Sequence, residues 1–388
     1  MTTNLTPLIA EAPKIEAPVS APLPAATHGR VPSLDGLRGI SMLAVLLAHS
    51  LGTRNFFPRS AVEPYFGDLG SLGVRVFFVI SGSLITSLLL KEVAKTGHIS
   101  LKGFYLRRTF RIFPAFYTYL AVMATLGALG IIQMSPADVL HAATYTVNFT
   151  STRAWYIGHV WSLSVEEQFY LLWPPALMLW LHARRPGVAP PTPLDRAEAT
   201  RRRAKWVALA VIGLAPFARL LIWTFLPRQR SLIGEAFPTI ADSIAFGCLF
   251  ATLRGYFDAN AGYLRVLRSR WFWLIVPVIL ALNHGASHPR VFYAFGDTLL
   301  DLLIAVTIDR AVRFPDGLSG RALNGRFLIH VGVLSYSIYL WQQPFLNRHS
   351  SGLFQSFPIN LIAALICAHA SYYLIERPAL RLRVCIFG

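Results

Sequence analysis

Charged side chains are scarce in this chain of 388 residues: Asp, Glu, Lys and Arg together make up 14% of it. A soluble domain carries about 25%, so the composition excludes an ordinary water-soluble protein. Acidic residues are fewest, with 19 Asp and Glu against 36 Lys and Arg. Hydrophobic residues make up 54%, and the mean hydropathy is +0.48. Much of the surface of such a chain has to face something other than water.

Cysteine is almost absent as well. Cys248, Cys367 and Cys385 show neither a CxxC spacing nor a partner histidine, which excludes a disulfide framework and indicates no metal site. We predict no metal and no tightly bound cofactor. The first residues also lack the basic start and apolar core of a cleavable signal. Because they are rich in Pro and Ala, we predict a disordered cytoplasmic tail at 1–33.

Long apolar runs are abundant, and runs of about 17 to 25 residues are typical of helices that cross a membrane. We predict an all-α, polytopic integral membrane protein with about ten transmembrane helices. The predicted crossings lie approximately at 34–52, 69–90, 114–134, 159–181, 206–226, 235–253, 271–283, 291–309, 327–346 and 357–376.

The positive charge follows this topology. Segments on the N-terminal side of the predicted membrane carry most of the 36 Lys and Arg, and the positive-inside rule then puts both termini in the cytoplasm. The net charge therefore indicates topology and anionic lipid headgroups, and we predict no nucleic-acid partner. An eleventh crossing at 137–150 would turn the basic segment 182–205 outward, so we interpret 137–150 as a re-entrant or interfacial helix.

The predicted domain organisation is simple. One membrane domain spans residues 34–380 and is interrupted by a flexible cytoplasmic loop at 183–205, which contains RRPGVAPPTP. A cytoplasmic tail follows at 381–388. We find no soluble domain and no sequence repeat, and nothing in the sequence indicates an oligomeric state.

The first predicted span, SLDGLRGISMLAVLLAHSLG, carries a charge and an imidazole. Arg38 and His49 are eleven residues apart, about 16 Å in rise and about 20° in rotation, so they share one helix face. Asp35 stands one turn before the arginine. Arg38 alone is compatible with a side chain that reaches the headgroups, and His49 alone with an interfacial histidine. An arginine within a span costs about 2.5–3.5 kcal/mol and usually marks function, so together they favour a functional site.

Further polar residues lie in the outer halves of other predicted spans. WSLSVEEQF contains Ser162, Ser164 and Glu166, with Ser162 and Glu166 on one helix face. The topology puts His49 in the same outer layer as Arg75, Glu166, Asp242 and Asp297. A carboxylate near an imidazole is a plausible general-base arrangement, and we predict that Glu166 orients His49 as the aspartate does in a serine-protease triad.

A second group of cations lies on the cytoplasmic side. In YLRRTFRIFP, Arg108 and Arg111 are one helical turn apart. Basic residues at an inner boundary are what topology alone demands. Paired arginines also bind phosphates well, and Arg38 adds a third cation. Phosphate-binding charge inside and acid–base residues outside suit a reaction that takes a group from a cytoplasmic anionic donor to an acceptor beyond the membrane.

The chain resembles the membrane acyltransferase-3 family, which includes bacterial O-antigen and exopolysaccharide O-acetyltransferases. The resemblance covers residues 33 to about 380. It rests on the joint occurrence, in order, of LDGLRGI followed by His49, GVRVFFVISGSLIT, YLRRTFRIFP, WSLSVEEQFYLLWP, SYSIYLWQQP and YYLIERP.

The resemblance implies transfer of an acyl group, usually acetyl from the co-substrate acetyl-CoA, to a carbohydrate hydroxyl at the bacterial cytoplasmic (inner) membrane. In this family an arginine and a histidine matching Arg38 and His49 are held to be essential. The residues we expect at the site are His49 and Glu166 for catalysis, Arg38, Arg108 and Arg111 for CoA binding, and Asp35, Arg75, Ser162, Ser164, Asp242, Asp297 and Gln342 for substrate or support. His49 acts as general base or as acyl carrier.

One position departs from the family pattern, because LWHQP is common where this chain has LWQQP. Gln342 cannot take up a proton near neutral pH, so the chemistry depends more on His49. An extracytoplasmic or lipid-linked carbohydrate is the preferred acceptor, and a small glycosylated metabolite or glycolipid is the alternative. A transporter that catalyses no reaction is a third hypothesis, since intramembrane ionisable residues also form proton relays.

Overall fold

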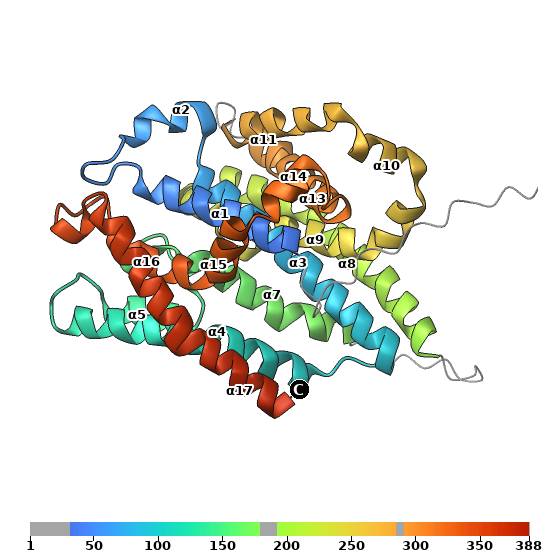
Figure 1. The fold of residues 1–388 in the computed structure, drawn as a ribbon, viewed down its shortest axis with the longest axis horizontal. Coiled ribbons are helices and arrows are strands. Elements are labelled where there is room, and N and C mark those ends of the chain that lie inside the picture. Colours follow the sequence, from blue (N-terminus) through green and yellow to red (C-terminus); the bar gives the residue numbers. More distant parts are fainter. Residues whose placement is uncertain (1–31, 179–191, 285–290, 388) are drawn as a thin grey trace, which may run out of the picture. The chain divides into compact units, whose positions relative to one another are not determined.

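The computed structural model describes residues 32–178, 192–284 and 291–387, and every regular element in these ranges is a helix (Figure 1). The predicted all-α class is therefore confirmed. Of the predicted N-terminal tail, residues 1–31 lie outside the described residues, and α1 (Pro32–Ser50) begins directly after them.

Local sequence explains where the central helices begin and end. The side chain of Asp68 accepts hydrogen bonds from the backbone of Gly70 and Ser71 and so caps α3 (Leu69–Thr96), which satisfies donors that the first helical turn leaves free. Helix α4 (Leu101–Ala128) begins after Ser100, whose side chain caps it in the same way.

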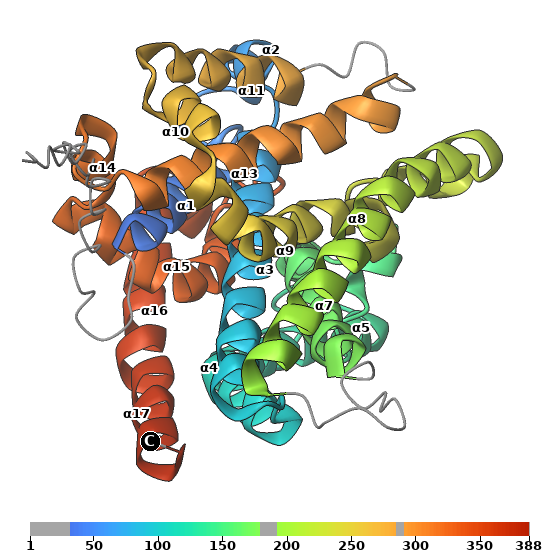
Figure 2. The same cartoon turned by 90° about the vertical axis from the view of Figure 1, so that its right-hand side faces the viewer.

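The core is a series of helix pairs. Helix α1 packs against α3 and against α15 (Arg326–Phe345), and α3 packs against α9 (Phe237–Ala259), which in turn packs against α8 (Pro193–Phe225) (Figures 1 and 2). Helix α7 (Val160–Met178) contacts α3 and α9. The helices carrying His49, Arg75 and Asp242 therefore follow one another through the core.

Glycines set how closely these helices approach. A Cβ atom on Gly332 of α15 would lie 1.8 Å from the backbone oxygen of Asp35 in α1. One on Gly82 of α3 would lie 2.0 Å from the backbone oxygen of Ile244 in α9. Small residues permit such backbone contact between membrane helices. The close approach fixes the register of α1 against α15, and hence which residue faces His49.

The remaining elements are shorter. They are α2 (Glu63–Phe66), α5 (Pro136–Ala143), α6 (Trp155–Gly158), α10 (Ala261–Arg268), α11 (Ile275–His284), α13 (Asp297–Arg313), α14 (Leu318–Leu323), α16 (Ile359–Ser371) and α17 (Arg377–Phe387). Two π-helical turns, η6 (Phe292–Gly296) and η8 (Tyr372–Glu376), precede α13 and α17. Figure 2 shows α16 and α17 running on in one direction.

Length and composition identify membrane-crossing candidates in the described part of the chain. Four helices, Leu69–Thr96, Pro193–Phe225, Pro227–Ala259 and Ile359–Ile386, are long and apolar enough. The bent pair Ala261–Arg268 and Arg270–His284 would make a fifth. Helices α1, α4, α7 and α15, which carry the predicted catalytic and CoA-binding residues and Gln342, are not in this set. The structure thus supports a helical integral membrane protein, and the ten crossings stay a prediction.

Three segments refine the sequence predictions. Residues 137–150 form α5 and a short 3-10 turn; an eight-residue helix rises only about 12 Å, too little to cross a bilayer. The predicted loop at 183–205 is helical from Pro193 onward, because Thr192 and Asp195 form a capping box there; residues 183–191 lie outside the described residues. Pro114 lies inside α4 rather than in its first turn, so the basic segment and the third predicted span are one helix.

Candidate active site

A cavity of about 440 Å³ lies among α1, α3, α6, α7 and α15, and we call it the outer cavity. Its size falls in the range of small-molecule sites. His49 lines it together with aromatic, polar and charged side chains. The functional groups at its wall are His49, Arg59, Asp68, Arg153, Trp155, His159, Trp161, Glu235, Tyr339, Gln343 and Arg348.

Gln342 orients the imidazole of His49. Nδ1 of His49 lies 2.8 Å from Oε1 of Gln342, and Nε2 of Gln342 donates to Oε1 of Gln343 at 3.2 Å. Since an amide oxygen only accepts, Nδ1 of His49 carries the proton and Nε2 is the basic nitrogen. The residue that departs from the family pattern therefore sets the tautomer of the predicted catalytic histidine.

The predicted pairing of His49 with Glu166 is wrong in this structure. Glu166 instead accepts a hydrogen bond from Oγ of Ser81 at 2.6 Å. That serine also accepts a bond from the Tyr170 hydroxyl at 3.3 Å. The prediction failed because helical spacing places Glu166 on a face of α7, whereas the packing of α7 against α3 decides what that face meets. Among the described residues that line the outer cavity, Glu166 is not included.

Two buried residues that the sequence did not single out contribute to the cavity wall. His159 is 3% exposed, and neither ring nitrogen makes a hydrogen bond within 3.5 Å, although the Leu340 backbone lies close to it. The Tyr339 hydroxyl donates to the carbonyl oxygen of His159 at 2.8 Å and lies 2.6 Å from Oγ of the predicted residue Ser162. The signal for His159 was its position one turn before Ser162 in GHVWSLS.

Ser164 and Asp35 have local roles. Oγ of Ser164 donates to the carbonyl oxygen of Val160, four residues earlier in its own helix. Asp35 pairs with Arg38 across one turn of α1, with 3.3 Å between Oδ1 and Nη1. This pair lies at the end of α1 opposite His49.

The three predicted donor-binding arginines share one neighbourhood, which we call the inner cation cluster. Arg111 is repelled by both Arg38 and Arg108 and attracted by Glu376. The guanidinium carbon of Arg108 lies 3.8 Å from the centre of the Tyr170 ring, and its Nε is buried without a hydrogen-bond partner. Of these three arginines, none lines the outer cavity among the described residues. A passage between the two sites stays a prediction.

The other predicted intramembrane residues form a separate buried assembly, the ionic network of Arg75, Arg219, Asp242, Asp297 and Asp301. Arg75 of α3 donates to Asp297 and, at 2.9 Å, to Asp301, both on α13. Arg219 of α8 pairs with Asp242 of α9 at 2.7 Å. We predicted that Arg75, Asp242 and Asp297 share the outer layer with His49 as substrate-binding or supporting residues. Among the described residues, none of the three lines the outer cavity, so a direct contact with a substrate there is not indicated.

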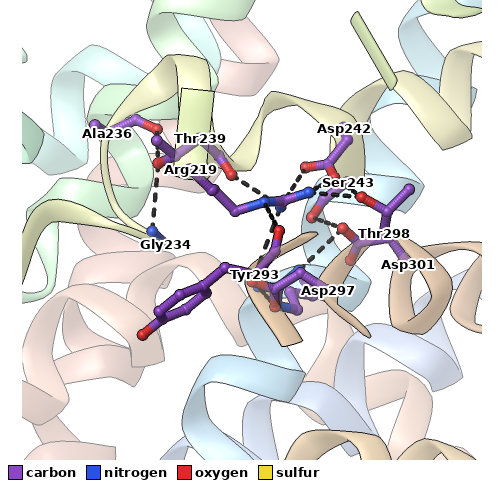
Figure 3. A network of polar contacts seen from close by, with 11 residues as sticks. Arg219, Gly234, Ala236, Thr239, Asp242, Ser243, Tyr293, Asp297, Thr298 and Asp301 are labelled. Carbon is purple, nitrogen blue, oxygen red and sulfur yellow. Dashed lines mark hydrogen bonds and ion pairs between the residues drawn. The ribbon is translucent and has the colours of Figure 1, made fainter. Parts of the chain in front are cut away.

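Within this ionic network Arg219 is saturated. Figure 3 shows its guanidinium between Thr239, Asp242, Thr298 and the backbone of Tyr293. Nε donates to the Tyr293 carbonyl at 3.0 Å, Nη1 to the Thr239 carbonyl at 3.0 Å, and Nη2 to Asp242 and to Thr298. Tyr293 lies in the π-helical turn η6, where a carbonyl leaves the regular helix pattern. We interpret these bonds as structural, because they hold α8 against α9 and the turn η6.

Comparisons with known proteins agree with the sequence motifs. The family described as an acyltransferase domain matches residues 31–375. The O-acetyltransferase OatA of Staphylococcus aureus (strain NCTC 8325 / PS 47) is 26% identical over 90% of this chain and 57% of its own length. YrhL of Bacillus subtilis (strain 168), named as a candidate peptidoglycan O-acetyltransferase, is 25% identical over 90% of this chain and 55% of its own length. The chain spans little more than half the length of these relatives. No solved structure matches it.

Proposed function

Because the chain belongs to the acyltransferase domain family, we propose that it transfers an acyl group from acyl-CoA to a hydroxyl group of a carbohydrate. Acetyl is the acyl group we propose, since the relatives are named O-acetyltransferases. The acceptor we favour is an extracytoplasmic or lipid-linked polysaccharide unit, with peptidoglycan as one case. A small glycosylated metabolite or glycolipid is the second candidate, because a cavity of about 440 Å³ would also admit it.

The observation that carries this proposal is the pairing of His49 with Gln342 at the wall of the outer cavity. Nε2 of His49 removes the proton of the acceptor hydroxyl while its oxygen attacks the thioester carbonyl. The carbon–sulfur bond then breaks, the acetyl group stays on the acceptor oxygen, and the CoA thiolate takes the proton from the imidazolium. The same nitrogen is placed for brief acetylation, so transfer by way of acetyl-histidine remains the second route.

The inner cation cluster is the proposed binding site for CoA. CoA carries several phosphate charges, and guanidinium groups bind phosphates through paired hydrogen bonds. Arg38 and Arg108 both repel Arg111, so a bound polyanion would relieve that repulsion. Alanine at Arg108 and Arg111 together should therefore raise KM for acetyl-CoA more than it lowers kcat.

The proposed topology has ten crossings, both termini in the cytoplasm and the outer cavity facing away from it, in a bacterial inner membrane. The exposed Cys385 lies near the C-terminus. A membrane-impermeant maleimide should label it in permeabilised cells and not in intact ones. Labelling in intact cells would reverse the orientation and with it the assignment of donor and acceptor sides.

Acetyl transfer itself is testable with purified protein in nanodiscs. Radiolabelled acetyl-CoA is supplied with peptidoglycan fragments, lipid-linked disaccharides and free oligosaccharides, and acetyl esters are measured together with released CoA. Wild type should form an ester on at least one acceptor, and His49→Ala should reduce the rate by about 10²–10⁴-fold. CoA release at the background level with every acceptor would remove the basis of the proposal.

A further inference from the structure

Most charged groups at the wall of the outer cavity already have partners. Arg153 and Glu235 form an ion pair, with 2.7 Å between Nη2 of Arg153 and Oε2 of Glu235. Arg59 binds Glu63 through two hydrogen bonds of 2.7 and 2.8 Å. Asp68 caps α3 through the backbone of Gly70 and Ser71. These side chains hold the connecting segments in place and have little capacity left for a ligand.

Arg348 differs from them. The described part of the structure gives its guanidinium no ion pair, and its Nε is buried without a hydrogen-bond partner. Burial lowers the pKa of this guanidinium below its ordinary value, and repulsion from Arg59 lowers it further, against attraction from Asp68 and Glu63. Asp68 and Glu63 attract Arg348 without forming an ion pair with it. A partly buried cation that lacks a direct partner is costly, so its position favours an anion.

The surroundings of Arg348 suit a sugar. Its guanidinium carbon lies 5.4 Å from the centre of the Trp155 ring, and that ring lies 6.3 Å from the imidazole of His49. Arg348 also interacts electrostatically with His49 itself. An aromatic ring offers an apolar face on which a sugar can pack, and this ring lies near both His49 and Arg348.

We propose that Arg348 binds an anionic group of the acceptor, a carboxylate or a phosphate, and so presents a neighbouring hydroxyl to His49. This rests on the proposed function and narrows the acceptor to negatively charged carbohydrates. The planar fork of a guanidinium binds either anion through two parallel hydrogen bonds. Arg59, Arg153, Asp68 and Glu235, which also line the cavity, are engaged with one another or with nearby groups and leave this role to Arg348.

The test compares acceptors that differ only in charge, in nanodiscs with acetyl-CoA. One pair is a hexuronate-containing oligosaccharide and its carboxamide derivative. The other is a lipid-linked disaccharide pyrophosphate and the free disaccharide. The measured quantity is the ratio of kcat/KM for the charged member to that for the neutral member. For wild type we expect a ratio of about ten or more in at least one pair.

Arg348→Gln should reduce this ratio to about one, and Arg348→Lys, which keeps the charge and loses the fork, should give an intermediate value. The control is Arg54→Gln, because Arg54 lies on the same outer side, donates to the Ser351 carbonyl at 3.0 Å and does not line the cavity among the described residues. This control should retain the wild-type ratio.

The outcomes separate the two proposals. A preference confined to the hexuronate pair assigns a sugar carboxylate, and one confined to the lipid-linked pair assigns a pyrophosphate. Equal transfer to charged and neutral members, or an unchanged ratio in Arg348→Gln, overturns the role of Arg348 and leaves acetyl transfer intact. Absence of transfer to all four acceptors counts against the proposed function. If Arg348→Gln does not fold, Arg348→Lys carries the test.

Discussion

The outer cavity and the ionic network contain the same kinds of side chains and differ in how fully their hydrogen bonds are satisfied. In the ionic network Nε, Nη1 and Nη2 of Arg219 all have protein acceptors. In the outer cavity, Nε of Arg348 is buried and has no hydrogen-bond partner among the described residues. His49 uses Nδ1 for Gln342 and has Nε2 left for a substrate.

This difference separates a structural cluster from a functional one. Buried polar groups in proteins nearly always have partners. Among the described residues, Nε of Arg348 in the outer cavity and Oδ1 of Asp301 in the ionic network both lack one. Arg348 lines the cavity and Asp301 does not, so we interpret only the former as available to a ligand. Charge alone does not make this distinction, since Arg75 and Arg348 are both partly or fully buried arginines. The following substitutions test this difference between the outer cavity and the ionic network.

Removing a cation from the ionic network should destabilise the folded protein, and not only reduce its activity. Arg219→Ala leaves Asp242 as a buried, uncompensated charge, and such a change costs about 3–5 kcal/mol. We expect a much smaller fraction of the protein to remain folded after heating. This fraction is measured by size-exclusion chromatography after incubation at a series of temperatures. His49→Ala is the matched control and should keep the wild-type thermal profile. A folded, inactive Arg219→Ala protein would assign this network a functional role.

Removing the support of His49 should slow the reaction and spare the fold. Gln342→Leu removes the hydrogen bond to Nδ1 and frees the imidazole to adopt the wrong tautomer. By analogy with the groups that orient metal-binding histidines, we expect kcat to fall by about 10–100-fold, with KM for acetyl-CoA nearly unchanged.

The matched control for this change is Gln343→Leu. Gln343 donates to the Trp155 carbonyl and accepts from Gln342 without touching His49. A loss in Gln343→Leu as large as that in Gln342→Leu would show that packing of α15, rather than the tautomer of His49, is responsible.

The smallest effect is expected inside the ionic network itself. It has three carboxylates and two guanidinium groups, and Oδ1 of Asp301 accepts no hydrogen bond while Oδ2 accepts from Arg75 and Ser243. Asp301→Asn can therefore keep both bonds, and we expect the free energy of unfolding to change by about 1 kcal/mol or less. Asp242→Asn should cost more, because both oxygens of Asp242 accept from Arg219. Equal losses would mean that the two hydrogen bonds from Arg219 to Asp242 contribute no more to stability than the bonds of Asp301.

Individual residues show where sequence reasoning succeeded. The spacing of Arg38 and His49 predicted that both lie on one helix, with the arginine near one end and the imidazole near the other, and α1 confirms it. The RxxR spacing predicted that Arg108 and Arg111 act together with Arg38, and the electrostatic neighbourhood of Arg111 agrees. The first conclusion depends on spacing within one helix. The second depends on the tendency of basic residues to lie on one side of the membrane.

Partners distant in sequence were predicted less well. Glu166 was assigned to His49, whereas the group that contacts His49 is Gln342, 293 residues away. Arg75 and Asp297 were assigned to the same site as His49 because they share a predicted depth. Residues at the same depth can still face different sides of the helix bundle. The ionic network and the outer cavity lie on different sides in this sense, and depth does not predict which.

Hydropathy and the 3.6-residue period are local properties, so they are enough to predict a helical membrane protein and the residues that share a face of each helix. The fold was needed to learn that Gln342 orients His49, that every guanidinium nitrogen of Arg219 is bonded and that Arg348 forms no ion pair with the described residues. Those outcomes depend on how closely α1 approaches α15 and α3 approaches α9, which Gly332 and Gly82 permit through backbone contacts between distant parts of the chain.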